Sequence, residues 1–289
     1  MKKISLLVLI IACIYACGSV PVTGRKQLTL VSDSEVLTLS LSNYNEYMKT
    51  AKKSTNQTAT AMVVKVGGKI AAAVEYYYKS NGMEDMLKNF AWEFNLVEDA
   101  SVNAFCMPGG KIVVYTGILP VTKDETGLAV VLGHEVAHAV AKHANERLSQ
   151  QMVAEYGSVL LGSLLDGASD QTKTLGQQIY GLGTQVGIML PFGRKQELEA
   201  DHLGLIFMAI AGYNPEAAIP FWQRMSQSGG SSMPEFLSTH PSNDTRITDI
   251  QKELPEAMKI YNALQNNSST HKNTTVTPSS SRTDENWHF

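Results

Sequence analysis

The sequence predicts an α+β fold that is mostly helical, with a small β-sheet packed beside one central helix. Apolar and polar residues alternate from Trp92 to Val97, as they do in a half-buried strand. Two more strands are expected at Ser101–Cys106 and Lys111–Thr116, because a Met-Pro-Gly-Gly turn separates them. A helix with an apolar body is expected from Lys123 to about Arg147.

Five further stretches have the spacing or the end signals of helices. Ser32 or Ser34 can cap the first of them, and a proline in the first turn opens the fourth. These stretches are about Ser34–Ser54, Ala59–Lys79, Arg194–Ala211, the helix that opens at Asn214-Pro215-Glu216, and Thr245 to about Leu264.

The stretch from Met152 to Leu190 is apolar but is interrupted by glycines and charged residues. No uninterrupted apolar run in it reaches the roughly 20 residues that span a bilayer. We therefore expect a helical hairpin rather than a membrane span. Packing in the core is the favoured role of this hairpin, and an edge of a substrate cleft or a membrane-touching surface are the alternatives.

The composition is that of a globular protein with one polar tail. The chain has 289 residues, of which 44% are hydrophobic and 18% charged. We expect one domain at residues 34–264, while the polar residues 265–289 hold too little apolar mass to pack and are expected to be disordered. The formal net charge of -3 leaves no electrostatic footprint for nucleic acid, so neither DNA nor RNA is expected as a partner.

The first residues resemble an export signal. Lys2 and Lys3 precede an apolar run, and Ile14-Tyr15-Ala16-Cys17 resembles a bacterial lipobox. We expect residues 1–16 to be a signal peptide, and residues 17–33 to be a lipid-modified cysteine, Cys17, with a connecting segment. This predicts a lipoprotein anchored in the bacterial cell envelope, in the outer membrane, and facing the periplasm. An ordinary cleaved signal peptide and an uncleaved anchor are the alternatives.

His134, Glu135 and His138 form the pattern H-E-x-x-H within the expected central helix. Residues four apart lie on one face of a helix, so both imidazoles can reach the same ion. Two neutral imidazoles suit zinc, and a carboxylate beside them can take a proton from a bound water. The apolar residues around the motif indicate that the histidines are buried, and buried polar side chains need partners. One Zn²⁺ per chain is expected.

A third zinc ligand is expected further along the chain. The metzincin pattern would place a glycine and a histidine three and six residues after His138, but alanines stand there. His143 stands one residue before the position where the metzincin pattern has its histidine. Its angle on the expected helix points it away from His134 and His138. In RKQELEADHLG, Glu197 and Asp201 are four apart and share a helix face, whereas Glu199 points nearly the opposite way.

We therefore assign Glu197 as the third ligand. Asp201 is assigned as the acceptor that holds a ligand imidazole in the right tautomer. Glu199 and His202 are expected on a solvated helix surface, with His202 as the alternative ligand.

The two motifs, HEVAH at 134–138 and ELEAD at 197–201, resemble the paired motifs of the zinc metallopeptidases that include HtpX, BepA and the CAAX prenyl proteases, a gluzincin family. The resemblance implies a zincin-like catalytic domain in which His134, His138 and Glu197 bind zinc. It covers nearly the whole chain up to about Leu264.

Three other segments carry the resemblance. NAFCMPGGKIVVYTG resembles the strand and turn before the family's motif helix, and LSTHPSNDTRI resembles its C-terminal signature. PVTGRKQLTLVSDSE is similar to the segment after the lipidated cysteine in the bacterial lipoprotein branch.

The resemblance also implies site residues beyond the ligands. His240 is expected to approach the zinc, where it either stabilises the transition state or blocks the fourth position until substrate arrives. A loop that caps a helix is the alternative for His240. Arg246 is expected to anchor that loop, or else to form a surface salt bridge.

The strand that contains Asn103, Ala104 and Phe105 can present a free edge to which an extended polypeptide adds. The alternative is simple hairpin structure. Binding through the backbone of the substrate would give a broad sequence preference.

The expected function is that of a zinc-dependent endopeptidase acting on unfolded or misassembled envelope proteins, with Glu135 taking a proton from water. One rival is a zinc-holding chaperone or assembly factor for outer-membrane proteins that seldom cuts. A metal-free helical lipoprotein is the other.

Overall fold

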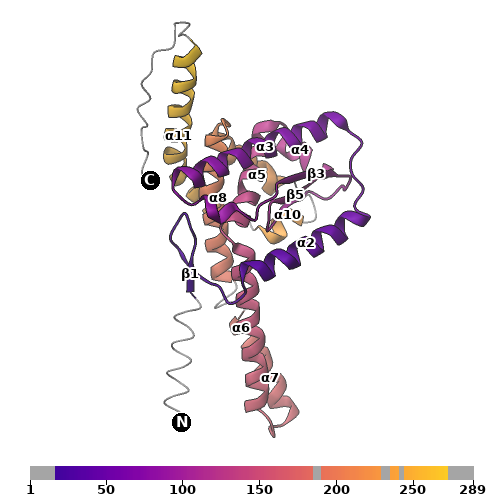
Figure 1. Ribbon diagram of the computed structural model, residues 1–289. Coiled ribbons are helices and arrows are strands. Elements are labelled where there is room, and N and C mark those ends of the chain that lie inside the picture. Colours follow the sequence, from indigo (N-terminus) through magenta and orange to yellow (C-terminus); the bar gives the residue numbers. More distant parts are fainter. Residues whose placement is uncertain (1–16, 185–189, 229–234, 241–243, 273–289) are drawn as a thin grey trace.

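The computed structural model describes residues 17–184, 190–228, 235–240 and 244–272 (Figure 1). Helices surround a small sheet, which confirms the mostly helical α+β fold. The helices longer than one turn are α2 (Asp33–Thr50), α3 (Gln57–Ser80), α4 (Leu119–Thr122), α5 (Glu125–Val140), α6 (His143–Leu164), α7 (Asp170–Thr184), α8 (Leu190–Ile210), α9 (Ala218–Gln227), α10 (Glu235–Thr239) and α11 (Asp244–Lys272).

The three expected strands form one sheet. Strand β5 (Lys111–Tyr115) lies in the middle, parallel to β3 (Glu93–Val97) and antiparallel to β4 (Ala104–Met107). Strand β4 is an edge of this sheet and lies beside α5. A second sheet pairs β1 (Cys17–Ser19) with β2 (Lys26–Leu28).

The expected single helix from 123 to 147 is wrong, because the chain forms two helices there. Helix α5 begins after Asp124, whose side chain accepts a hydrogen bond from the backbone of Gly127, and it ends at Val140. Lys142 then adopts the left-handed conformation, with φ of 58°, and α6 begins at His143. A residue in the left-handed conformation ends a helix and changes the direction of the chain. The angular positions of side chains around α5 therefore do not extend to the residues after Lys142.

Helices α5 and α8 approach so closely that glycines are required where they meet. A Cβ added at Gly133 would lie 2.8 Å from the carbonyl oxygen of Gly204, and one added at Gly204 would lie 2.9 Å from the amide nitrogen of His134. Every residue of α5 from Gly127 to Val140 is buried. The helix that carries the H-E-x-x-H motif is therefore the centre of the molecule.

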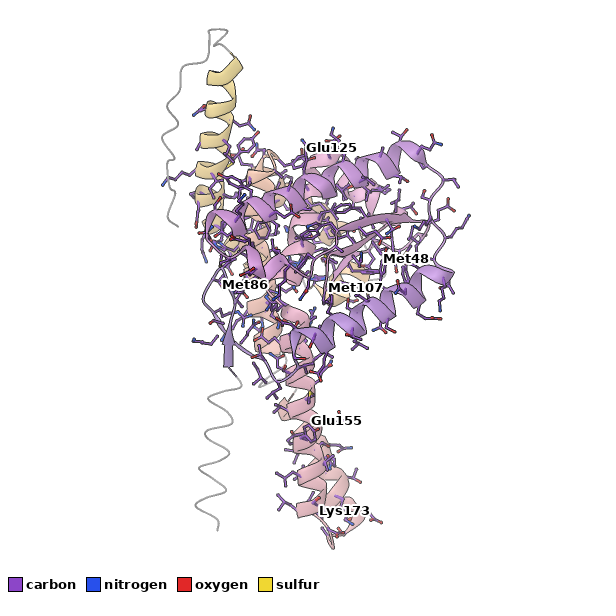
Figure 2. The ribbon with its side chains drawn as sticks, in the orientation of Figure 1. Met48, Met86, Met107, Glu125, Glu155 and Lys173 are labelled. Atoms are coloured by element: carbon purple, nitrogen blue, oxygen red, sulfur yellow. The ribbon has the colours of Figure 1, made fainter. Side chains whose placement is uncertain are left out.

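Helices α6 and α7 form the expected hairpin, and it extends away from the body of the protein (Figure 1). Its side chains spread into solvent, as those of Glu155 and Lys173 show in Figure 2. The expectation that its apolar residues pack in the core is wrong for the described part up to residue 184. Several are exposed, among them Tyr156 at 68% and Leu164 at 74%. Among the described helices, none is long and apolar enough to cross a membrane.

Both ends of the described chain reach beyond the limits expected for the domain. The β1–β2 segment places Val20 in the core and Arg25 against α6 and α8. Helix α11 continues to Lys272, past the expected end near Leu264. Residues 1–16, the expected signal peptide, lie outside the described residues, as do residues 273–289 of the expected tail.

The substitution Gly204→Ala tests the close contact of α5 and α8. We expect it to lower the free energy of unfolding by about 1–3 kcal/mol, because the added methyl group meets backbone atoms that cannot turn aside. Gly68→Ala in α3 is the matched control, since a Cβ there meets nothing within 4 Å. It should raise stability by up to about 1 kcal/mol. Urea denaturation measures both, and equal effects of the two substitutions would contradict the contact.

Candidate metal centre

Two helices and one loop bring the site residues together. Helix α5 carries His134, Glu135 and His138, and α8 carries Glu197. His240 follows directly after α10. All five side chains are buried, and four of them, those other than Glu135, place one possible ligand atom each within 4.8 Å of the others.

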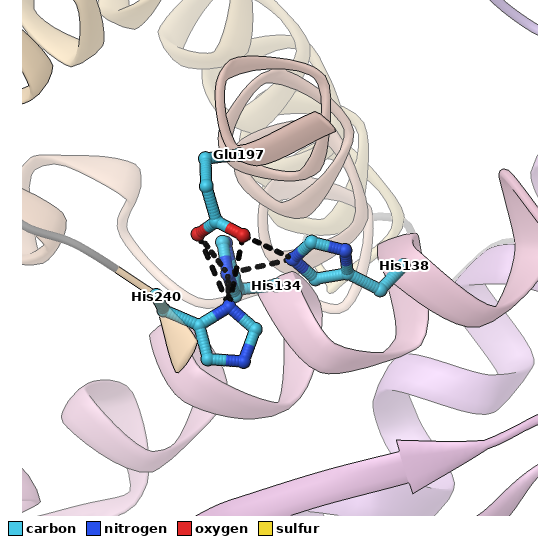
Figure 3. Close-up of side chains that lie close together, drawn as sticks. All are labelled: His134, His138, Glu197 and His240. Carbon is cyan, nitrogen blue, oxygen red and sulfur yellow. Dashed lines mark hydrogen bonds and ion pairs between the residues drawn. The ribbon is translucent and has the colours of Figure 1, made fainter. Parts of the chain in front are cut away.

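The four possible ligand groups point toward one another in Figure 3. The Nε2 atoms of His134 and His138 are 3.0 Å apart, and Nδ1 of His240 lies 3.2 Å from Nε2 of His134. Oε2 of Glu197 lies 3.4 Å from Nε2 of His134, and Oε1 of Glu197 lies 3.3 Å from Nε2 of His138. Nδ1 of His240 is 3.1 Å from both of those oxygens.

These separations fit a zinc ion. Zinc bonds of about 2.0–2.2 Å in tetrahedral geometry place neighbouring ligand atoms about 3.3–3.5 Å apart. Imidazole and carboxylate are the groups that zinc sites use, and all four are buried here. The residues present therefore fit the metal that the sequence implies.

Asp201 and Arg246 hold His134 in place. Nδ1 of His134 lies 2.9 Å from one oxygen of Asp201, so the ring donates its Nδ1–H there and presents Nε2 to the site. Arg246 donates to both oxygens of Asp201, at 2.6 and 2.7 Å, and its guanidinium lies 3.6 Å from the centre of the Trp222 ring. Nη1 of Arg246 also approaches the carbonyl oxygen of His240, at 3.3 Å.

Burial and neighbouring charges set the protonation of the site. Burial and the charge of Arg246 lower the pKa of His134, but hydrogen bonds with Asp201 and Glu197 outweigh them and raise it to about 9. Burial raises the pKa of Glu197, yet the charge of His138 and hydrogen bonds with the histidines hold it well below its usual range. Two imidazole nitrogens 3.0 Å apart need a proton or a metal ion between them.

Glu135 lies beside this group without belonging to it. Its Oε1 atom is buried and has no hydrogen-bond partner among the described residues, although Nε2 of His240 lies 3.5 Å away. Unpartnered buried oxygens are costly, so their presence points to a ligand such as water. Glu135 is thus a carboxylate available for proton transfer.

Two residues near this site lie elsewhere than the sequence predicts. His143 was expected to point away from the motif pair, and Glu199 was expected on a solvated surface. Both expectations are wrong. Nδ1 of His143 lies 2.7 Å from Nδ1 of His138, and Nε2 of His143 lies 2.9 Å from a carboxylate oxygen of Glu199. The cause is the left-handed turn at Lys142, for which the sequence offers no glycine as a signal.

His202 stays outside the site. Its Nδ1 lies 2.8 Å from a carboxylate oxygen of Glu253 on α11, and its side chain is partly exposed. His202 is not one of the four groups that converge on the H-E-x-x-H histidines, so the geometry gives no support to it as the alternative ligand.

The edge strand runs close to the motif helix. Ala104 is buried, Phe105 and Asn103 are partly exposed, and the backbone of Phe236 donates to the carbonyl oxygen of Val102. Burial and then the charge of Glu135 raise the pKa of Cys106, so this strand lies within electrostatic reach of that carboxylate. Strand β4 pairs with β5 alone among the described strands.

The buried pair Arg246–Asp201 generates a testable prediction. Arg246→Met should lower the free energy of unfolding of the zinc-free protein by about 3–5 kcal/mol, because it leaves buried carboxylates without a counter-charge. Combining it with Asp201→Asn should cost clearly less than the sum of the two single changes. Urea denaturation with a chelator present measures all three variants, and additive effects would show that the pair is not coupled.

Curated relatives share much of this sequence. A mitochondrial metalloendopeptidase OMA1 from Schizosaccharomyces pombe is 40% identical over 61% of this chain and 50% of its own length. OMA1 from Saccharomyces cerevisiae is 33% identical over 83% of this chain and 70% of its own length. The β-barrel assembly-enhancing protease of Escherichia coli is 30% identical over 55% of this chain and 34% of its own length. The chain thus spans between 34% and 70% of the length of these relatives.

These relatives correct the expected location. The similar proteins from fungi, a plant and animals are named as mitochondrial metalloendopeptidases. The expectation of a bacterial envelope lipoprotein facing the periplasm is therefore wrong, and these relatives give no support to a lipid anchor at Cys17. In the structure, Cys17 begins strand β1.

The sequence profile of one peptidase family matches residues 65–254. This range includes the whole ligand group together with Glu135, Asp201 and Arg246. It covers well over half of the chain, and the geometry of the site agrees with the zinc dependence of that family. The chain belongs to peptidase family M48.

Proposed function

We propose that this chain is a zinc-dependent endopeptidase that cuts unfolded polypeptides. The observation that carries the proposal is the convergence of His134, His138 and Glu197 on one buried point beside the carboxylate of Glu135. Its relatives are named metalloendopeptidases in three kingdoms, which supports the same reaction class. One zinc ion per chain would be held by the two imidazoles and the Glu197 carboxylate.

Bound zinc supplies a Lewis acid for the scissile carbonyl and lowers the pKa of a ligating water to about 7. Glu135 takes the proton of the attacking water on its unpartnered Oε1 and then passes it to the nitrogen of the departing amine. Asp201 keeps the proton of His134 on Nδ1, so that Nε2 remains available to the metal. Arg246 fixes Asp201 in turn.

His240 closes the site in this conformation. Its Nδ1 atom lies at the distance of a fourth ligand, and its ring stacks on Phe236 with centroids 4.7 Å apart. A zinc site with four protein ligands has no position for water, as in structural sites. We infer that His240 blocks the centre and must move before substrate is cut.

The closed arrangement also favours a second function. A protein that holds zinc with four side chains can serve as a chaperone or assembly factor that seldom cuts. The relative from Escherichia coli is named a β-barrel assembly-enhancing protease, and this name includes both assembly and proteolysis for that protein. The two functions differ in whether cleavage depends on Glu135.

The edge strand β4 is the proposed place for the substrate backbone. An extended polypeptide can add to its free edge beside α5, with Asn103, Ala104 and Phe105 in contact. Recognition through backbone hydrogen bonds requires an unfolded segment and reads few side chains. The substrate class is therefore extended polypeptide of broad sequence.

Glu135→Gln tests the hydrolase. It should reduce cleavage of a fluorescently labelled unfolded protein by about 100-fold or more, since the amide cannot accept the proton. Zinc content measured by mass spectrometry should stay at one ion per chain. His202→Ala is the control that should retain both. Undiminished cleavage by the Glu135 variant would overturn the mechanism, and absence of cleavage by the unaltered chain would favour the assembly factor.

His240→Ala tests the block. Cleavage of the same substrate should rise, because the variant leaves the fourth zinc position to water. Adding Glu135→Gln should abolish that gain, which separates it from contaminating proteases. A fall in cleavage would mean instead that His240 stabilises the transition state.

A further inference from the structure

A chain of hydrogen-bonded groups connects the N-terminal segment to one imidazole of the candidate metal centre. Arg25 donates through Nε to Glu199 at 2.7 Å, and through its two terminal nitrogens to both oxygens of Glu146, at 2.9 and 2.7 Å. Thr23 also donates to Glu199. Glu199 in turn meets Nε2 of His143 at 2.9 Å.

The direction of the hydrogen bonds in this chain follows from the chemistry of its members. An ionised carboxylate only accepts, so His143 donates its Nε2–H to Glu199. A neutral imidazole then has its lone pair on Nδ1, and this atom faces Nδ1 of His138 at 2.7 Å. His138 must therefore donate its Nδ1–H to His143. The tautomer that results leaves the lone pair of His138 on Nε2, 3.0 Å from Nε2 of His134.

The inner members of this chain are too buried for water to replace them. His143 and Glu146 are 0% exposed, and Glu199 is 7% exposed. Without His143 as its acceptor, His138 would be left with a buried, unpaired Nδ1–H group. His138 would then turn or change tautomer, and either change would remove the lone pair of its Nε2 from the centre.

The arrangement is the counterpart of the one around His134. There, Arg246 holds Asp201, and Asp201 holds the imidazole directly. Around His138, Arg25 holds Glu199, and the additional imidazole of His143 spans the distance to the ligand. Both supporting carboxylates come from α8, the helix that also supplies Glu197.

We propose that His143, set by Glu199 and Arg25, is a positioning residue that fixes the tautomer of His138 for zinc binding. The inference rests on the proposed function in one respect, namely that His138 is a zinc ligand. It adds that metal affinity depends on a contact from the segment before α2.

The test compares His143→Leu, which cannot accept a hydrogen bond, with His143→Asn, whose side-chain oxygen can take the place of Nδ1. Zinc affinity is measured by competition with a chromophoric chelator, and the absorption spectrum of the Co²⁺-loaded protein reports the ligand geometry. We expect about 10–100-fold weaker zinc binding and an altered cobalt spectrum for the leucine variant. The asparagine variant should restore most of both.

His202→Leu is the matched control, because His202 is also a histidine held by a glutamate but lies outside the centre. It should leave zinc affinity unchanged. Should His143→Leu fail to fold, Glu199→Leu carries the test, since its side chain cannot accept the Nε2–H of His143. It should weaken zinc binding, as His143→Leu should.

The outcomes separate this inference from the proposed function. Wild-type zinc affinity and cobalt spectrum in a folded His143→Leu or Glu199→Leu variant would overturn the positioning role, even if the unaltered chain binds zinc and cuts. Equal losses in the leucine and asparagine variants would also overturn it. If the unaltered chain does not bind zinc, the proposed function and this inference both fail.

Discussion

The close contact between α5 and α8 is the constraint on which the rest of the structure depends. Gly133 and Gly204 let the two backbones meet, and the ligand residues lie on either side of that contact. His134 stands next to Gly133, and Asp201 lies less than one helical turn before Gly204. A longer distance between the helices would separate the imidazoles from the carboxylates. Packing therefore sets the geometry of the metal centre before any ion is present.

That contact concentrates negative charge inside the protein. Five buried carboxylates, those of Glu135, Glu146, Glu197, Glu199 and Asp201, face the two arginines Arg25 and Arg246. Buried charges are tolerated when they are paired or coordinate a metal. The excess of carboxylates is a reason in itself for a divalent cation at this place. Burial alone does not neutralise Glu197, because the charge of His138 and the hydrogen bonds with the histidines hold its pKa low.

The sequence was sufficient for the elements that carry strong local patterns. The three strands, the ligand pair on α5 and the facing carboxylates of α8 follow from periodicity and from residue spacing. The left-handed turn at Lys142 could not be predicted, because a lysine there gives no local signal, and the environment of His143 was lost with it. The hairpin was expected in the core because its composition is apolar. Composition alone does not show whether another part of the chain packs against those apolar side chains. The bacterial location failed because it rested on a short N-terminal pattern.

The two arginines that support the motif imidazoles lie on opposite sides of the motif in the sequence, although the carboxylates that they hold both come from α8. Arg25 precedes the motif by more than a hundred residues, and Arg246 follows it by more than a hundred. During synthesis, Arg25 leaves the ribosome before the motif and Arg246 leaves it after, so His134 obtains its full set of partners late. A nascent or truncated chain carries the H-E-x-x-H motif without the scaffold that orients it. The orientation of the candidate metal centre is thus completed only when the segment after α10 has been made.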